Sequence, residues 1–176
     1  MNTYGFTGYS AAGSVVGLLY LVGGGGGTQV AGSLAWAEVY DPLADKWSVV
    51  PSPVERRERL MTGCATLDKK FFAVAATGGV VFDPASASWN AISAALHKSW
   101  RGRAAVVKGI LFSPDYSGKI IGYDLAKDDW QELEGVQLRL PKLTSLCAVS
   151  DKLYVLGERP LRGRASELAV VAVEVE

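Results

Sequence analysis

The stretch VYDPLADKW (Val39–Trp47) places a strand-like Val-Tyr before Asp-Pro, a short polar turn and a tryptophan. The pattern returns in VVFDPASASW (Val80–Trp89) and in IIGYDLAKDDW (Ile120–Trp130). The aromatic residues stand at 40, 82 and 123 and the tryptophans at 47, 89 and 130, so both markers recur after 42 and then 41 residues. A period of this length indicates repeated β-sheets.

Short β-branched or aromatic segments, bounded by Gly, Pro, Asp or Asn, predict four strands in each repeat. The first repeat has them at about 11–16, 18–22, 37–40 and 46–50, the second at 61–67, 71–75, 80–83 and 88–92, and the third at 103–107, 110–113, 120–123 and 129–133. A fourth repeat supplies strands at about 143–149, 153–156 and 168–173. We predict an all-β fold of four-stranded antiparallel blades, a partial or small β-propeller. Residues 1–176 form one domain, with repeats at about 9–50, 60–92, 102–133 and 142–176.

LYLVGG (Leu19–Gly24), VYDPLADKW and LYVLG (Leu153–Gly157) resemble the kelch repeat, in which an aliphatic strand ends in Gly-Gly and is followed by Tyr-Asp and Trp. The motif is fully intact only in the first repeat, because the others show ATGG, FSPD and LGER at the glycine positions. Such repeats are similar to those of plant F-box/kelch proteins, although no F-box is visible. The resemblance covers nearly the whole chain and implies a protein-binding module.

The repeated residues are interpreted as architecture. Trp with Tyr or Phe supplies apolar area for stacking blades, Asp binds turn backbone, and glycine at a strand end permits positive φ. The residues given this structural role are Gly23, Gly24, Tyr40, Asp41, Trp47, Phe82, Asp83, Trp89, Tyr123, Asp124 and Trp130.

Composition argues against several kinds of chemistry. One histidine, His97 in a polar loop, and two cysteines cannot build the usual zinc site, nor the copper site of galactose oxidase, whose fold kelch proteins share. We therefore expect no enzyme, no metal and no cofactor. Cys64 and Cys147 are expected to be buried, reduced thiols in a cytoplasmic or nuclear protein. A formal net charge of zero favours neither a membrane nor nucleic acid.

Basic residues gather in the predicted loops between second and third strands and between blades, whereas acids occupy the other hairpin turns. These loops hold PVERRER, HKSWRGR, QLRLPK and ERPLRGR, with eleven of the 18 basic residues. Arg forks pair with carboxylates or phosphates, and Trp often anchors interfaces. The candidate partner-binding residues are Arg56, Arg57, Arg59, Lys98, Trp100, Arg101, Arg103, Tyr116, Arg139, Lys142, Arg159, Arg162 and Arg164. The alternative is that these loops are merely polar.

The preferred hypothesis is a non-enzymatic module that binds a protein or peptide, acidic or phosphorylated, and selects substrates for an SCF-type ubiquitin ligase. Two alternatives stay open: a small-molecule enzyme of propeller fold, and an assembly protein that associates through blade edges. Three complete repeats and part of a fourth also suggest a homodimer that completes a propeller, because an unclosed array exposes strand edges.

Overall fold

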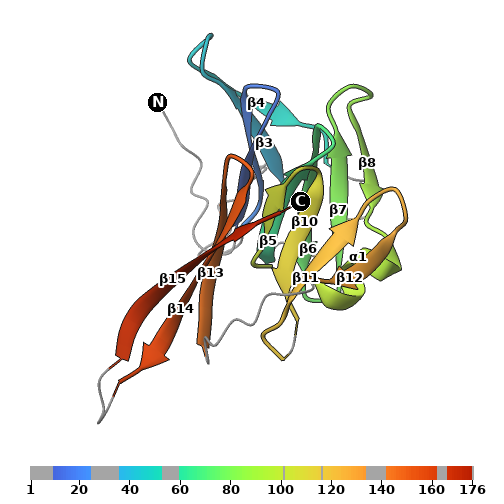
Figure 1. Cartoon of the computed structure of the whole chain (residues 1–176). Helices are drawn as coiled ribbons and strands as arrows, with labels where there is room; N and C mark the ends of the chain where they lie inside the picture. The colour runs from blue at the N-terminus through green and yellow to red at the C-terminus, as the bar shows by residue number, and fades with distance from the viewer. Residues whose placement is uncertain are drawn as a thin grey trace. The chain divides into compact units, whose positions relative to one another are not determined.

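The computed structural model describes residues 10–24, 36–52, 60–100, 102–115, 117–133, 142–161 and 166–175 (Figure 1). These residues form antiparallel sheets, or blades, in which sequential strands are neighbours. Blade 1 comprises β1 (Ser10–Val15), β2 (Leu18–Gly23), β3 (Ala37–Asp41) and β4 (Lys46–Val50). Blade 2 comprises β5 (Met61–Leu67), β6 (Lys70–Ala75), β7 (Gly78–Asp83) and β8 (Ser88–Ala91).

The short helix α1 (Ala94–Ser99) follows blade 2. Blade 3 comprises β9 (Ala105–Val107), β10 (Ile110–Pro114), β11 (Ile120–Asp124) and β12 (Asp129–Glu132). Blade 4 has three strands, β13 (Lys142–Val149), β14 (Lys152–Pro160) and β15 (Ser166–Glu174). The predicted all-β fold of propeller blades is confirmed.

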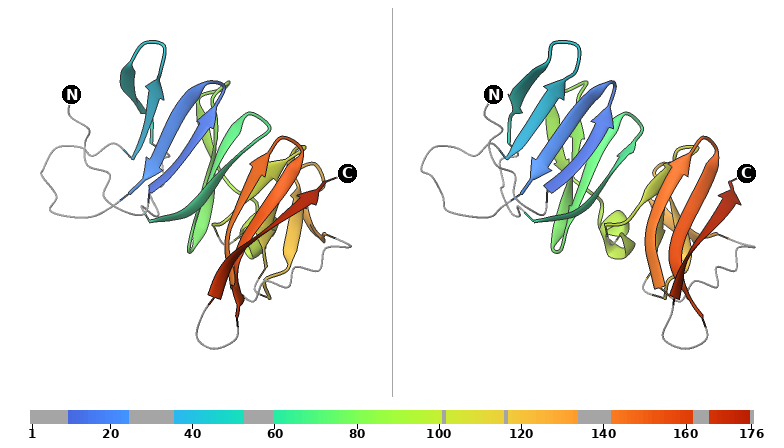
Figure 2. Two further views of the ribbon diagram at one scale, coloured as in Figure 1. Left: turned by 60° about the vertical axis from the view of Figure 1, so that its left-hand side comes forward. Right: turned by 90° about the vertical axis from the view of Figure 1, so that its left-hand side faces the viewer.

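The chain divides into two compact units, Met1–Ile92 and Ser93–Glu176, each with two blades. In both units the strands of a blade run side by side with alternating direction, as Figure 2 shows. The proposal that residues 1–176 form one domain stays a prediction.

The predicted strands agree with the observed ones to within one or two residues at most ends, but blade 4 is an exception. Strands β14 and β15 pair over nine residues, from Lys152↔Glu174 to Pro160↔Ser166. Arg159 and Lys142, which we expected in loops, therefore lie in β14 and β13. The loop prediction was wrong there because LGER and its neighbours lack the glycine pair that ends the second strand of blade 1.

One turn recurs at the third hairpin of blades 1, 2 and 3. The carboxylates of Asp41, Asp83 and Asp124 accept backbone N–H groups two residues on, at 2.8, 2.9 and 2.9 Å respectively. The last residue of each turn has positive φ: Asp45 48°, Ala87 50° and Asp128 51°. Such Asx turns explain why an Asp follows each aromatic residue.

The repeated aromatic and Trp residues lie opposite one another on neighbouring strands. The ring centroids of Tyr40–Trp47, Phe82–Trp89 and Tyr123–Trp130 are 5.2, 4.7 and 5.2 Å apart. The backbone φ of Gly23 and Gly24 is 75° and 89°, as expected where strand β2 ends. These contacts join strands of the same blade, and the structural role of the repeated residues stays an interpretation.

The two cysteines differ, although each stands four residues before an Asp-Lys pair. Cys64 is half-buried and Cys147 is exposed, so the expected burial of Cys147 was wrong. In blade 2, Leu67 pairs with Lys70, so the turn consists of Asp68 and Lys69. In blade 4, Val149 pairs with Lys152, so the turn consists of Ser150 and Asp151. This one-residue shift sends Cys147 to the opposite face of its sheet.

Candidate binding surface

The acidic residues predicted at the hairpin turns lie there. Asp68 and Asp151 occupy the turns that join the first two strands of blades 2 and 4. The others lie in or beside the turns that join the last two strands of blades 1, 2 and 3: Asp41, Asp45, Asp83, Asp124, Asp128 and Asp129.

Most of the candidate partner-binding residues lie outside the part of the chain that the structure describes. Arg56, Arg57, Arg59, Arg101, Tyr116, Arg139, Arg162 and Arg164 lie outside the described residues. Among the candidates that are described, Lys98 lies on α1 and Arg103 precedes β9, and both are exposed. Two exposed cationic side chains of the candidate surface are therefore described, Lys98 on α1 and Arg103 before β9.

Trp100 was predicted as an exposed anchor for a partner, and this was wrong. Its side chain is 1% exposed. The segment HKSW was expected to be a polar loop, but Ala94–Ser99 is helical and includes the half-buried His97. Leu96 and Trp100 are four residues apart, so they share one side of this turn, and both are buried.

Helix α1 is fixed at both ends. The Ser93 hydroxyl accepts a hydrogen bond from the Leu96 backbone N–H at 3.0 Å, and the Trp100 backbone N–H donates to the Leu96 carbonyl at 3.2 Å. The indole N–H of Trp130, on β12, donates to the Ala95 carbonyl at 2.9 Å. Lys98 is thus carried on a capped and anchored turn.

The start of α1 lies against an acidic turn, which the predicted division into two opposite faces did not foresee. The Ser93 and Tyr123 hydroxyls both donate to the Asp128 carboxylate. These hydrogen bonds hold the pKa of Asp128 below its usual value, with the bond from Ser93 contributing most. Burial and then the Asp128 contact raise the pKa of Tyr123.

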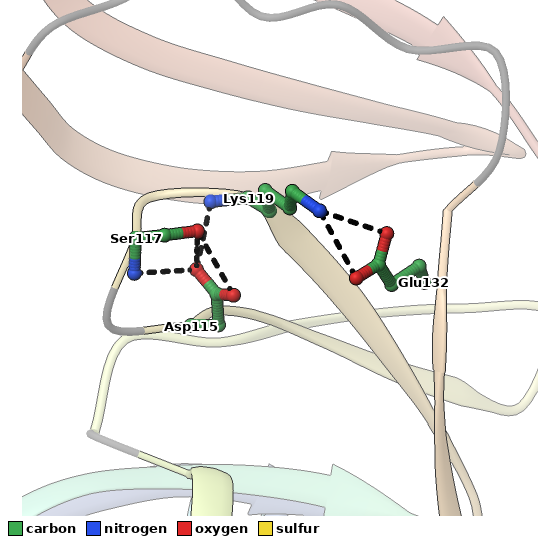
Figure 3. Close-up of polar contacts among 4 residues, drawn as sticks. All are labelled: Asp115, Ser117, Lys119 and Glu132. Carbon is green, nitrogen blue, oxygen red and sulfur yellow. Dashed lines mark hydrogen bonds and ion pairs between the residues drawn. The ribbon is translucent and has the colours of Figure 1, made fainter.

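A second set of hydrogen bonds lies at the connection between β10 and β11 (Figure 3). Asp115 accepts hydrogen bonds from the Ser117 backbone and hydroxyl, both at 2.8 Å, and from the Lys119 backbone at 2.9 Å. Although burial acts to raise the pKa of Asp115, the hydrogen bonds from Ser117 and Lys119 hold it below its usual value. The Lys119 ammonium lies 3.1 Å from each carboxylate oxygen of Glu132.

In the sequence, FSPD was interpreted as a worn glycine pair, and Tyr116 after it as a candidate partner-binding residue. The Asp-x-Ser spacing of residues 115–117 is itself a signal for this turn, since Asp side chains bind backbone N–H groups two residues on. The described residues of the β10–β11 connection are thus joined by hydrogen bonds between the Asp115 side chain and the Ser117 and Lys119 backbone.

Within the described residues, no group of three or more His, Cys, Asp or Glu side chains could hold a metal ion. In the same part of the chain, no helix is long and apolar enough to cross a membrane.

The comparisons with known proteins agree with the repeat pattern. The family model described as Kelch motif matches residues 7–53, which include blade 1. An F-box/kelch-repeat protein of Arabidopsis thaliana is 30% identical over 161 residues, covering 72% of this chain and 34% of the relative. A second from the same plant is 26% identical over 155 residues, covering 84% of this chain and 40% of the relative.

A third F-box/kelch-repeat protein of that plant is 29% identical over 138 residues, covering 73% of this chain and 31% of the relative. The chain therefore spans about a third of the length of these curated relatives. The described blades and the matched motif show that the chain is a kelch-repeat protein built of β-propeller blades, similar to plant F-box/kelch-repeat proteins.

Proposed function

We propose that this chain is a protein-binding module whose basic loops recognise an acidic or phosphorylated segment of a partner. By analogy with its F-box/kelch-repeat relatives, the partner is a substrate delivered to an SCF-type ubiquitin ligase in the cytoplasm or nucleus. The propeller blades act as a scaffold, and recognition does not require a chemical step.

The observation that carries this proposal is that hydrogen bonds hold the backbone beside two exposed cations, which precede blade 3 in the chain. Lys98 stands on the capped helix α1, and Arg103 precedes β9 with its backbone carbonyl held at 2.8 Å by the buried Ser113 hydroxyl. A fixed backbone reduces the entropy lost when a side chain is immobilised on binding. Arg103 can pair with a carboxylate or phosphate through two parallel N–H groups.

The test measures binding of fluorescent peptides by anisotropy, at low and at physiological salt. The probes are a Glu-rich peptide carrying phosphoserine and a Lys-rich peptide of equal length. We expect the acidic probe to bind with strong salt dependence. The double variant Lys98→Ala, Arg103→Ala should bind it about two- to thirtyfold more weakly, since each exposed pair contributes about 0.2–1 kcal/mol.

The matched control is Lys46→Ala, Lys69→Ala, which removes two exposed lysines from hairpin turns or their edges. It should leave the affinity for the acidic probe unchanged. If both double variants weaken binding equally, only net charge matters and no basic recognition surface exists. If the acidic probe binds no better than the basic one, recognition of an acidic segment is refuted.

A further inference from the structure

The blades of unit 1 pack with a defined polarity. We call the Trp-bearing face of a blade the side on which its repeated Trp lies. In blade 2 this face, with Phe82 and Trp89, packs against blade 1, where Tyr20 lies 5.5 Å from Phe82 and Trp36 lies 5.1 Å from Trp89 between ring centroids. The Trp89 indole N–H donates to the Pro51 carbonyl at 2.6 Å.

Unit 2 shows the same polarity. Leu153 and Val155 of β14 occupy the strand positions that Phe71 and Ala73 occupy on the Trp-bearing face of blade 2, when counted from the start of each strand. They are fully buried against Val107, Phe112 and Ile120 of blade 3, which face away from Trp130 in the strand register. Within each unit, the Trp-bearing side of the later blade thus packs on the opposite side of the earlier blade.

Among the described residues of unit 1, no blade packs on the Trp-bearing face of blade 1. Its apolar residues, which alternate with the packed side along each strand, are Leu19, Leu21, Tyr40, Trp47 and Val49. Val49 is 67% and Leu19 38% exposed, whereas Phe71 of blade 2, at the position of Leu19, is 0% exposed. In the described part of the chain the Trp47 indole N–H has no hydrogen-bond partner, unlike those of Trp89 and Trp130.

In blade 4 it is the opposite side, the one that faces away from blade 3, on which no described strand packs. The side that faces away from the unit 2 core carries Cys147, Tyr154, Leu156, Leu168, Val170 and Ala172. Leu168 is 66% and Val170 56% exposed. Both belong to β15, whose second edge pairs with no described strand, so backbone carbonyls at this edge are available as acceptors. β15 contains no Lys, Pro or bulge of the kind that protects edge strands.

We propose that two copies of this chain associate head to tail, with the uncovered side of blade 4 in one copy docked on the Trp-bearing face of blade 1 in the other. Between the two copies, the Trp-bearing side of one blade would pack on the opposite side of another blade, as it does inside each unit. This contact buries Val49 and Trp47 against Leu168 and Val170, and a β15 carbonyl accepts the Trp47 N–H. Because the two surfaces differ, the contact is heterologous, and in the proposed dimer each copy supplies one surface of each kind.

The first test is the native mass by light scattering after size exclusion, at concentrations from about 1 to 100 μM, a range typical for weak to moderate association. The variants are Val49→Lys and Val170→Lys. Lysine is preferred to glutamate because Val49 lies opposite Glu38 on the neighbouring strand. The control is Leu43→Lys, in the β3–β4 turn at 97% exposure.

We expect wild type and Leu43→Lys to reach twice 18.7 kDa and each of the other variants alone to stay monomeric. An equimolar mixture of Val49→Lys and Val170→Lys should form dimers again, because each variant retains one intact surface of the opposite kind. Both substituted positions are exposed, and circular dichroism confirms that the variants are folded.

A second readout follows Cys147, which lies on the blade 4 surface. Its modification by a thiol reagent should slow at least threefold as the wild-type concentration rises, but not in Val49→Lys. A wild-type chain that is monomeric throughout overturns the proposal. So does a dimer that only one of the two variants disrupts, since like surfaces would then be in contact, or a dimer that neither disrupts.

Discussion

Replacement of Gly79 by alanine tests whether the close packing inside blade 2 explains the displaced glycine pair of the second repeat. A Cβ atom at Gly79 would lie 2.5 Å from the Ile92 Cδ1 atom and 2.6 Å from the Ala73 carbonyl oxygen. The Ile92 side chain can rotate away. The Ala73 carbonyl belongs to strand β6, which lies beside β7, so relief requires the two strands to separate.

The expected cost is at the upper end of the range for overpacking. Contacts near 2.6 Å are about 0.8 Å shorter than ordinary van der Waals approach, and extra methyl groups in a packed site typically cost about 1–3 kcal/mol. We expect Gly79→Ala to lower the free energy of unfolding by about 3 kcal/mol. For a chain of this size that corresponds to a fall in Tm of roughly 6–12 °C.

The neighbouring glycine provides the control. A Cβ atom at Gly78 meets nothing within 4 Å, and its φ is not in the left-handed region. Gly78→Ala should therefore leave stability unchanged or raise it by about 0.4–1 kcal/mol, through reduced entropy of the unfolded chain. Thermal and urea unfolding followed by circular dichroism measures both variants.

The double variant Gly79→Ala, Ile92→Ala separates the two contacts. It removes the clash with Ile92 and retains the clash with the Ala73 carbonyl, so stability should not return to the wild-type value. The reasoning is refuted if Gly79→Ala is neutral, or if Gly78→Ala costs as much as Gly79→Ala.

The indole hydrogen bonds and the Asx turns give two further predictions. Trp89→Phe and Trp130→Phe should each lower the free energy of unfolding of the monomer by about 1 kcal/mol more than Trp47→Phe does. In the described structure, the indoles of Trp89 and Trp130 donate to a backbone carbonyl and that of Trp47 does not. Urea titration at low protein concentration measures the difference. Equal costs for all three would contradict this account. The Lys127 contact, followed by turn backbone N–H groups, holds the pKa of Asp124 below its usual value. A carboxyl whose pKa is lower in the folded state stabilises the fold above the unfolded pKa of about 3.9, and that stabilisation is lost as the pH falls through the folded pKa. Asp124→Asn should therefore show a smaller fall in Tm than wild type between about pH 5 and pH 2, and an identical fall would show that Asp124 does not contribute.

The hairpins could be predicted because their signals are local. Asp41, Asp83 and Asp124 bind backbone within their own turns, and each Trp pairs with the aromatic residue directly across the hairpin. These contacts join residues at most seven positions apart, so a repeated string of letters is sufficient to specify them. Even a variation between repeats is local: Tyr40 bonds Asp45, whereas Phe82, which has no hydroxyl, is followed five residues later by Ala87.

The candidate site was much less predictable. The polarity of HKSW suggested a solvated loop with an accessible Trp100, because helix formation over only six residues depends on the Ser93 cap and on the Trp130 contact with Ala95. Cys147 and Cys64 hold equivalent positions in the sequence repeat, but they lie on opposite faces of their sheets. A one-residue change in turn position reverses which side chains of a strand point to each face.

The sequence by itself determined the number and order of the strands in each blade, since turn chemistry and cross-strand pairs act over a few residues. Only the tertiary structure decided which side of each blade is covered. That depends on contacts between residues far apart in the chain, such as Tyr20 with Phe82 and Leu153 with Phe112 in their separate units. Burial in a β-sheet protein is a property of the neighbouring sheet, and an alternating strand pattern alone does not say which face that sheet will cover.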